Sequence, residues 1–211
     1  LHIRKIRKNK YTIDDLIEKG VMTRKVANYL IEKINTTGVV ICGKGASGKT
    51  NLLNVLLDLI YYNMSGLVIQ ESKELFSNKH PDFMFQHITN SKNGRPAYGL
   101  KEEATNGLLT DLDHFIIGEI KGGEAWYFLN AASTGHICSC TVHAPSAKDA
   151  IDKLADYVTY ESKYSKEQAM YMLKELKTIV FMSHFKIREI VEITGWDDEK
   201  KQLIFKTVYQ L

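Results

Sequence analysis

The sequence GKGASGKT, residues 43–50, restricts the fold of this chain more than any other segment. It follows the short apolar run GVVIC and precedes NLLNVLLDLI, which has the composition of a largely apolar helix. Its glycines allow backbone N–H groups to turn toward an anion, and the start of the following helix adds partial positive charge. The pattern G-x-x-x-x-G-K-[ST] between a buried strand and a helix therefore predicts a phosphate-binding loop rather than a simple glycine-rich turn.

The residues of this loop have separate predicted tasks. Lys49 is expected to reach the β- and γ-phosphates of a nucleotide, and the Thr50 hydroxyl is placed for Mg²⁺. Lys44 and Ser47 are expected to contribute through their backbone only. The residues predicted here to contact the nucleotide are Gly43, Lys44, Gly45, Ala46, Ser47, Gly48, Lys49, Thr50 and Asn51.

Short strands and helices alternate along most of the chain. Two helices capped by threonine are predicted before the loop. After it, apolar strands at 67–70, 113–120 and 136–143 alternate with helices, which predicts an α/β fold with a mostly parallel sheet and helices on both faces. Residues 180–210 alternate as strands around GWDDEKK, which is typical of a hairpin turn, so antiparallel strands are expected at the C-terminal end.

Acidic residues follow two of the predicted strands. Glu119 ends the buried strand at 113–120, and the carboxyl ends of parallel strands form the ligand edge of such a sheet. The strand LVIQ lies in sequence between the loop strand and the Glu119 strand, which suggests the class of ATP-hydrolysing enzymes with an extra strand between the two. Glu71 and Glu74 come just after LVIQ, where a solvated loop is the alternative reading. His143 ends the next strand and points toward the same edge.

Composition narrows the function classes. The chain has 211 residues, a formal net charge of +3 and three cysteines. This weak charge gives little reason to expect nucleic acid, and the odd cysteine count indicates a reducing compartment. No apolar run approaches the roughly 20 residues of a membrane span. His136, Cys138, Cys140 and His143 invite a zinc reading, but strand alternation puts the first three on one face and His143 on the other, so core packing with polar strand ends is the better account.

The order of motifs resembles one known family, across essentially the whole chain. The motifs are IRKIRK, YTIDDLIEKG, GKGASGKT, QESKEL, IIGEIKGGEA and TGHICSCTVHAPSAKDAIDKL. The chain resembles the ATPases of type II and type IV secretion, conjugation and type IV or Flp pilus assembly. This resemblance implies a RecA-like P-loop NTPase domain at 37–211, preceded by a linker and N-terminal helices at 1–36. The family's N-terminal domain is expected to be missing from this chain, whose first residue is Leu rather than Met.

The resemblance also carries roles to individual residues. It implies that Glu74 polarises the attacking water, that Glu119 acts with Mg²⁺ and water, and that His143 responds to the γ-phosphate. His136 matches the histidine of the family's TGH motif, and the resemblance places it among the nucleotide-binding residues. Arg4 and Arg7 lie where linker arginines of the family reach nucleotide phosphates.

The chain departs from the family pattern at three places. Gln70 and Glu71 stand where the family often has Glu-Asp. Lys121 replaces an arginine and so loses the bidentate fork of a guanidinium. The segment before Glu119 lacks the arginines common there, which leaves Arg95 as a candidate substitute or as a residue of an exposed turn.

The resemblance implies a hexameric motor that hydrolyses ATP with Mg²⁺ to power secretion, conjugation or pilus assembly. Its partners would be further copies of the chain and an inner-membrane platform, reached from the cytoplasmic side, with peripheral membrane association at most and no direct nucleic-acid contact. Two alternatives stay open: a scaffold module that binds ATP but hardly hydrolyses it, and a nucleic-acid-translocating motor with the same core.

Overall fold

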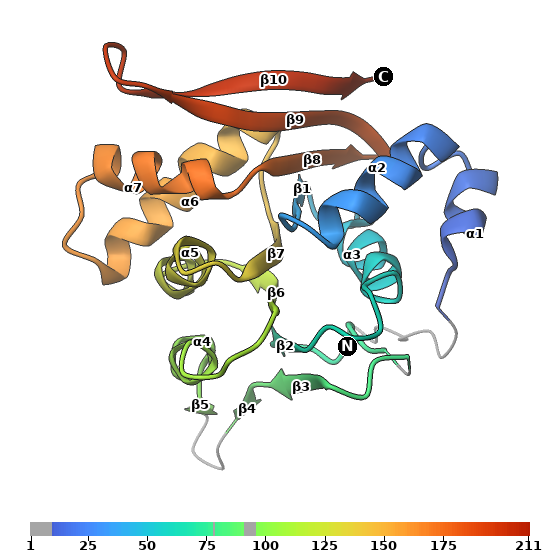
Figure 1. Cartoon of the computed structure of the whole chain (residues 1–211), viewed down its shortest axis with the longest axis horizontal. Helices are drawn as coiled ribbons and strands as arrows, with labels where there is room; N and C mark the ends of the chain where they lie inside the picture. The colour runs from blue at the N-terminus through green and yellow to red at the C-terminus, as the bar shows by residue number, and fades with distance from the viewer. Residues whose placement is uncertain (1–9, 78, 91–95) are drawn as a thin grey trace.

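An eight-stranded sheet forms the centre of the protein and separates two groups of helices (Figure 1). The computed structural model describes residues 10–77, 79–90 and 96–211. The strand order is β10-β9-β8-β1-β7-β6-β2-β3. Six neighbouring strands of this order, β8, β1, β7, β6, β2 and β3, run parallel to one another. The pairs β8–β9 and β9–β10 are antiparallel, and a separate ribbon pairs β4 with β5.

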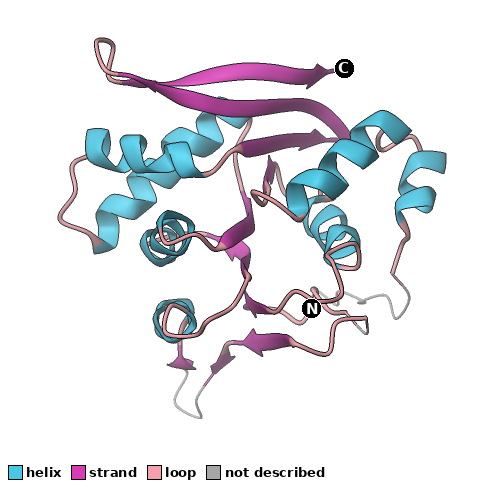
Figure 2. Cartoon of the chain, viewed as in Figure 1, coloured by secondary structure: helices cyan, strands magenta, loops and turns pink. Residues whose placement is uncertain are grey.

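The strands of the parallel part are short, and the two longest strands lie in the antiparallel part (Figure 2). Strands β1, β2, β6, β7 and β8 are mostly buried. Their bounds are β1 (Val40–Gly43), β2 (Gly66–Gln70), β3 (Phe83–His87), β4 (Thr89–Asn90), β5 (Pro96–Tyr98), β6 (His114–Ile120), β7 (Ile137–Val142), β8 (Thr178–Ser183), β9 (Lys186–Asp197) and β10 (Gln202–Gln210).

The helices begin where the sequence supplies caps. Thr12 and Thr23 cap the first two helices, and Ser146 and Ser165 cap two later ones. The bounds are α1 (Ile13–Glu18), α2 (Arg24–Ile34), α3 (Lys49–Leu57), α4 (Leu100–Gly107), α5 (Glu124–Ser133), α6 (Ala147–Glu161), α7 (Lys166–Met172) and the 3₁₀ turn η1 (Leu173–Glu175).

Each face of the sheet has its own core. Helices α1, α2 and α3 cover one face, where Leu30, Ile34 and Leu53 are fully buried against the strands. Helices α4 to α7 cover the other face, where Phe128 and Leu154 are buried. The predicted α/β fold, mostly parallel with an antiparallel C-terminal addition, is therefore confirmed. Among the described residues, no helix is both long and apolar enough to cross a lipid bilayer.

Two details of the topology differ from the sequence-based expectation. One strand does lie between β1 and the Glu119 strand β6, but it is β7, and β2 lies on the far side of β6. Chain order does not fix sheet order, because a crossover helix can carry the next strand to either side. The C-terminal strands also contain a second tight turn, between β8 and β9, which has no glycine or asparagine to mark it.

Candidate nucleotide site

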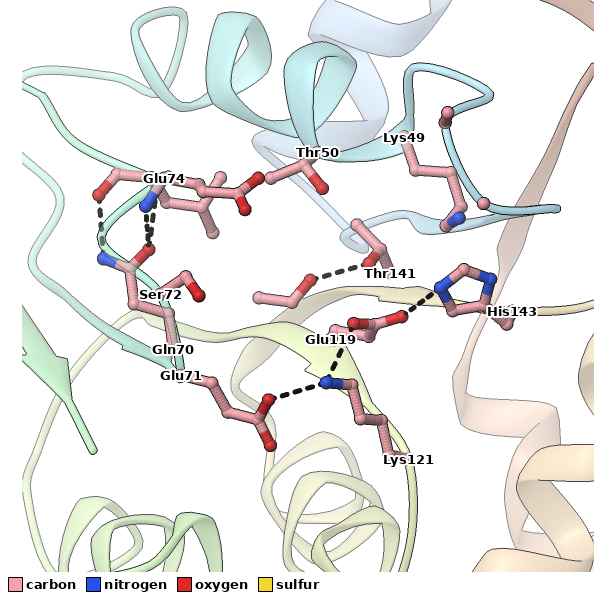
Figure 3. A pocket seen from close by; sticks show the side chains of 14 residues that line it. Lys49, Thr50, Gln70, Glu71, Ser72, Glu74, Glu119, Lys121, Thr141 and His143 are labelled. Atoms are coloured by element: carbon pink, nitrogen blue, oxygen red, sulfur yellow. Dashed lines mark hydrogen bonds and ion pairs between the residues drawn. The ribbon is translucent and has the colours of Figure 1, made fainter. Parts of the chain in front are cut away.

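A polar cavity opens at the carboxyl ends of the parallel strands, and its volume is about 280 Å³ (Figure 3). The phosphate loop forms one wall, and the ends of β2, β6 and β7 form the others. This is the edge where open parallel sheets bind their ligands. The cavity is lined by Gly45, Ala46, Lys49, Thr50, Gln70, Glu71, Ser72, Glu74, Leu75, Gly118, Glu119, Lys121, Thr141 and His143.

The loop between β1 and α3 uses its glycines for two separate reasons. Gly48 caps α3 with φ +98°, a backbone conformation that a side chain disfavours. Gly43 has φ +155°, and a Cβ there would lie 2.3 Å from the backbone oxygen of Met182. Ser47 is buried, and its Oγ has no hydrogen-bond partner among the described residues. The loop therefore packs closely against the backbone of β8, and the buried Ser47 hydroxyl could still form a hydrogen bond with a ligand.

The Lys49 ammonium is held by the loop itself. The residue is 6% exposed, and its Nζ donates to the backbone oxygens of Gly43 and Lys44 at 3.0 and 2.9 Å. Burial lowers the pKa of Lys49, and the nearby Glu119 carboxylate opposes this shift. Among the described residues the hydrogen-bond partners of this ammonium are the two carbonyl oxygens, so an anion in the cavity would stabilise it further.

Glu119 lies within a cluster of charged side chains on one side of the cavity (Figure 3). Its carboxylate is 2.5 Å from Nε2 of His143 and 3.3 Å from Nζ of Lys121. Lys121 also pairs with Glu71 at 2.6 Å, a contact that raises its pKa. Burial and the nearby Lys49 lower the pKa of His143 despite Glu119. Charges of both signs therefore hold this side of the cavity.

Neutral amide groups hold the opposite side, where Glu74 lies. Gln70 at the end of β2 donates to the Leu75 backbone oxygen at 2.8 Å and accepts from the backbone N–H groups of Glu74 and Leu75 at 3.0 and 2.8 Å. Asn54 on α3 donates to the Glu74 backbone oxygen and accepts from Phe76 N–H, both at 3.1 Å. The turn that carries Glu74 is thus fixed through its backbone to a strand and to the loop helix.

Several predicted site residues lie elsewhere. His136 precedes β7, at the opposite end of that strand from the cavity, and its ring contacts Thr134 and Ala131. Asn51 lines a separate small cavity beside α3. The predicted roles of Arg4, Arg7 and Arg95 concern residues outside the described part of the chain.

Cys138 and Cys140, which the alternative hypothesis of a zinc site would use as ligands, are core residues. Burial raises the pKa of both the Cys138 and Cys140 thiols, and Cys138 donates to the Phe128 backbone oxygen. Within the described ranges, no group of three or more His, Cys, Asp and Glu side chains is arranged to hold a metal ion. Magnesium does not need such a group, because it is usually held by one or two carboxylates, water and substrate phosphates. Thr50 and Glu119 line the same cavity and supply the hard oxygen donors that such a site uses.

Asn54 and Thr141 were missed by the sequence reasoning, and Gln70 and Lys121 were noted only as departures from a pattern. Gln70 is buried, and both the oxygen and the nitrogen of its amide form hydrogen bonds with the turn that carries Glu74. Thr141 donates to the Gly118 backbone oxygen at 2.7 Å and so ties β7 to the end of β6. A polar residue inside an apolar helix, such as Asn54 in NLLNVLL, was the one available signal, because buried polar side chains need partners.

The fold and site together define a P-loop nucleotide-binding protein of RecA-like α/β fold. The sequence matches the family described as Type II/IV secretion system protein over residues 1–180, and the chain belongs to this family. The predicted family resemblance is therefore confirmed.

Individual relatives support this assignment. The protein MJ0781 of Methanocaldococcus jannaschii is 33% identical over 146 residues, which cover 64% of this chain and 20% of that protein. The type IV secretion system protein VirB11 of Brucella suis is 30% identical over 124 residues, 56% of this chain and 33% of VirB11. This chain thus spans a fifth to a third of the length of these two relatives.

Solved structures share the fold. The crystal structure of the Brucella suis VirB11 ATPase superposes with a TM-score of 0.66 at 19% identity, covering 98% of this chain and 65% of that one. The pilus retraction motor PilT with bound ADP also gives a TM-score of 0.66, at 17% identity, covering 97% and 54%. At these identities the likeness is one of fold.

Proposed function

We propose that this chain is the ATPase domain of a secretion or pilus motor and that it hydrolyses ATP with Mg²⁺. One observation carries the proposal: Lys49 and Thr50 of the loop, Glu74 of the turn after β2 and Glu119 of β6 all line a single cavity. VirB11, described as an ATPase, and PilT, described with bound ADP, share the fold. Residues 37–211 would form the catalytic domain, with 1–36 leading into it.

The phosphates of ATP would take over the hydrogen bonds that Lys49 makes with its own loop. The exchange is favourable because an ammonium gains more from a phosphate oxygen than from a neutral carbonyl. Thr50 and Glu119 would hold Mg²⁺, which supplies positive charge against the phosphate oxygens. Glu74 would accept a hydrogen bond from the attacking water, since its turn is anchored independently of the nucleotide.

His143 would couple the phosphate state to the rest of the molecule. Burial and the nearby Lys49 lower its pKa, which favours the neutral ring, and Glu119 lies beside its Nε2. The position a Cβ of Gly45 would take is 3.7 Å from the His143 ring. Loss of the γ-phosphate would remove negative charge near the His143 ring. The ring and the segment that follows β7 would then change position.

The motor would act as a hexamer at the cytoplasmic face of an inner membrane, bound to a platform of the secretion or pilus machinery. Arg4, Arg7 and Arg95 are proposed to contact phosphates, within the subunit or across the ring. His136 precedes β7, at the end of that strand opposite the cavity, so it would contact a nucleotide only if the nucleotide is bound by a neighbouring subunit.

The test is phosphate release by the purified chain with ATP and Mg²⁺. Lys49→Ala and Glu119→Gln should each lower turnover by about 100-fold or more. Lys163→Ala, which removes an exposed lysine that does not line the cavity, is the matched control. Unchanged turnover in both site variants would exclude this mechanism.

The second candidate is a scaffold module that binds ATP without hydrolysing it. Gln70 stands where the family often has a glutamate, and its amide binds the backbone of the turn that carries Glu74. Micromolar ATP binding with negligible phosphate release, also in an assembled ring, would favour it. A nucleic-acid motor would instead show turnover stimulated by single-stranded DNA.

A further inference from the structure

The turn between β8 and β9 has an unusual conformation for its residues. Ser183 pairs with Lys186, which leaves His184 and Phe185 as the two central residues of the hairpin, with φ of +50° and +58°. Two-residue hairpins of this kind strongly prefer Asn-Gly or a similar pair, because both central residues have positive φ. A bulky side chain there is a genuine outlier. Strain of this kind often accompanies a binding role.

The strained turn lies against the phosphate loop. A Cβ on Gly48 would be 3.2 Å from Cδ1 of Phe185 and 3.5 Å from Cε of Met182. Phe185 is nevertheless 62% exposed, so much of its ring is open to solvent. A shallow cavity of about 20 Å³ lies beside it, lined by Leu16, Val21, Gly48, Asn51, Leu52, Met182 and Phe185.

This apolar surface and the large polar cavity both border the start of α3. Lys49 and Thr50, the residues for the β- and γ-phosphates and Mg²⁺, line the polar cavity. Asn51, the next residue, lines the small cavity under Phe185. If the γ-phosphate of a nucleotide lies near Glu119, the other phosphates follow the loop away from it. The end of the chain of phosphates that carries the nucleoside then lies near Asn51.

We propose that Phe185 is the platform on which the nucleobase stacks. The proposal rests on the proposed nucleotide function and adds to it the position of the base. The small cavity cannot enclose a base, so the base would lie on the exposed ring. Stacking on an aromatic ring does not read hydrogen-bonding groups, so Phe185 would hold adenine and guanine alike.

The experiment compares ATP with inorganic tripolyphosphate, which has the phosphates but no base. Binding of each, with Mg²⁺, is measured by calorimetry on the full chain and on the variants Phe185→Ala, Phe185→Gly and Phe185→Trp. Phe185→Ala and Phe185→Gly should weaken ATP binding by about tenfold and leave tripolyphosphate binding unchanged. Phe185→Trp should keep ATP affinity, and Phe205→Ala on β10, another exposed phenylalanine, is the control.

Phe185→Gly separates binding from folding. Glycine favours the positive φ of this position, so the variant should melt at the same temperature as the wild type or higher while binding ATP more weakly. Equal losses for ATP and tripolyphosphate would mean that Phe185 only shapes the loop, and an unchanged ATP affinity would mean that the base lies elsewhere; either result overturns the platform. A wild-type chain that binds neither compound would overturn the nucleotide function itself.

Discussion

The two acids of the cavity are held in different ways. Glu119 lies among charged side chains, with His143 and Lys121 both within 3.3 Å of its carboxylate. Glu74 lies on a turn that is fixed through its backbone by the neutral amides of Gln70 and Asn54. One side of the cavity thus depends on ionisation states, and the other on uncharged hydrogen bonds.

This difference separates two functions. A charged cluster rearranges when phosphate enters, because a new anion competes with Glu119 for Lys49, Lys121 and His143. An amide-held turn has no titrating group in its anchor and keeps its position whatever fills the cavity. We infer that the Glu74 side supplies fixed geometry for the attacking water and that the Glu119 side responds to the phosphate state.

The largest expected effect comes from Glu74→Gln. Loss of this carboxylate should lower kcat by about 100-fold or more, because general-base assistance contributes on that scale. The turn is anchored through backbone atoms, so ATP affinity should stay within about threefold of the wild type. Phosphate release and calorimetric ATP binding measure the two quantities. A variant that loses binding and kcat together would show that Glu74 also holds the nucleotide.

A smaller effect is expected from Asn54→Leu, which removes an anchor but no charge. Asn54 is 9% exposed, and leucine would leave the Glu74 oxygen and the Phe76 N–H without this partner. The free energy of unfolding should fall by about 1–3 kcal/mol. We expect kcat to fall by about tenfold as the turn loosens, since small misplacements of reacting groups are costly.

The matched control for Asn54→Leu is Asn106→Leu on α4, where the side chain is exposed. Urea unfolding and phosphate release should both stay near wild-type values in that variant. If Asn54→Leu loses stability but keeps its kcat, Gln70 alone positions the turn.

The charged side of the cavity was far more predictable from sequence than the amide side. Lys49, Thr50 and Glu119 belong to short motifs whose spacing reflects local geometry, and the helix caps at Thr12 and Thr23 are also local. Asn54 and Gln70 act only because α3 and β2 come together in the fold. The same holds for the place between β1 and β6, where LVIQ was expected and β7 lies. It also holds for the His184-Phe185 turn, where the surrounding structure imposes a left-handed conformation that these two residues disfavour.

The smallest expected effect concerns pH and the His143 side alone. Burial and Lys49 lower the pKa of His143 below its usual 6.5, against the pull of Glu119. Below pH 6.5 the unfolded chain therefore binds more protons at this residue than the folded one, so this contribution to stability is present above 6.5 and is lost as pH falls. Protonation also tightens the pair with Glu119 and draws that carboxylate away from other partners. We expect kcat to fall about two- to threefold between pH 7.5 and 5.5.

His143→Asn should flatten that profile, because asparagine does not titrate, whereas His87→Asn, whose ring does not line the cavity, should keep it. Phosphate release measured at saturating ATP across this pH range separates the two. If kcat of His143→Asn falls with pH as it does in the wild type, another group is responsible for the decline. The pH dependence could then not be assigned to the Glu119 side of the cavity. A flat profile in that variant alone would tie the response to one histidine and leave the amide-held turn of Glu74 independent of pH.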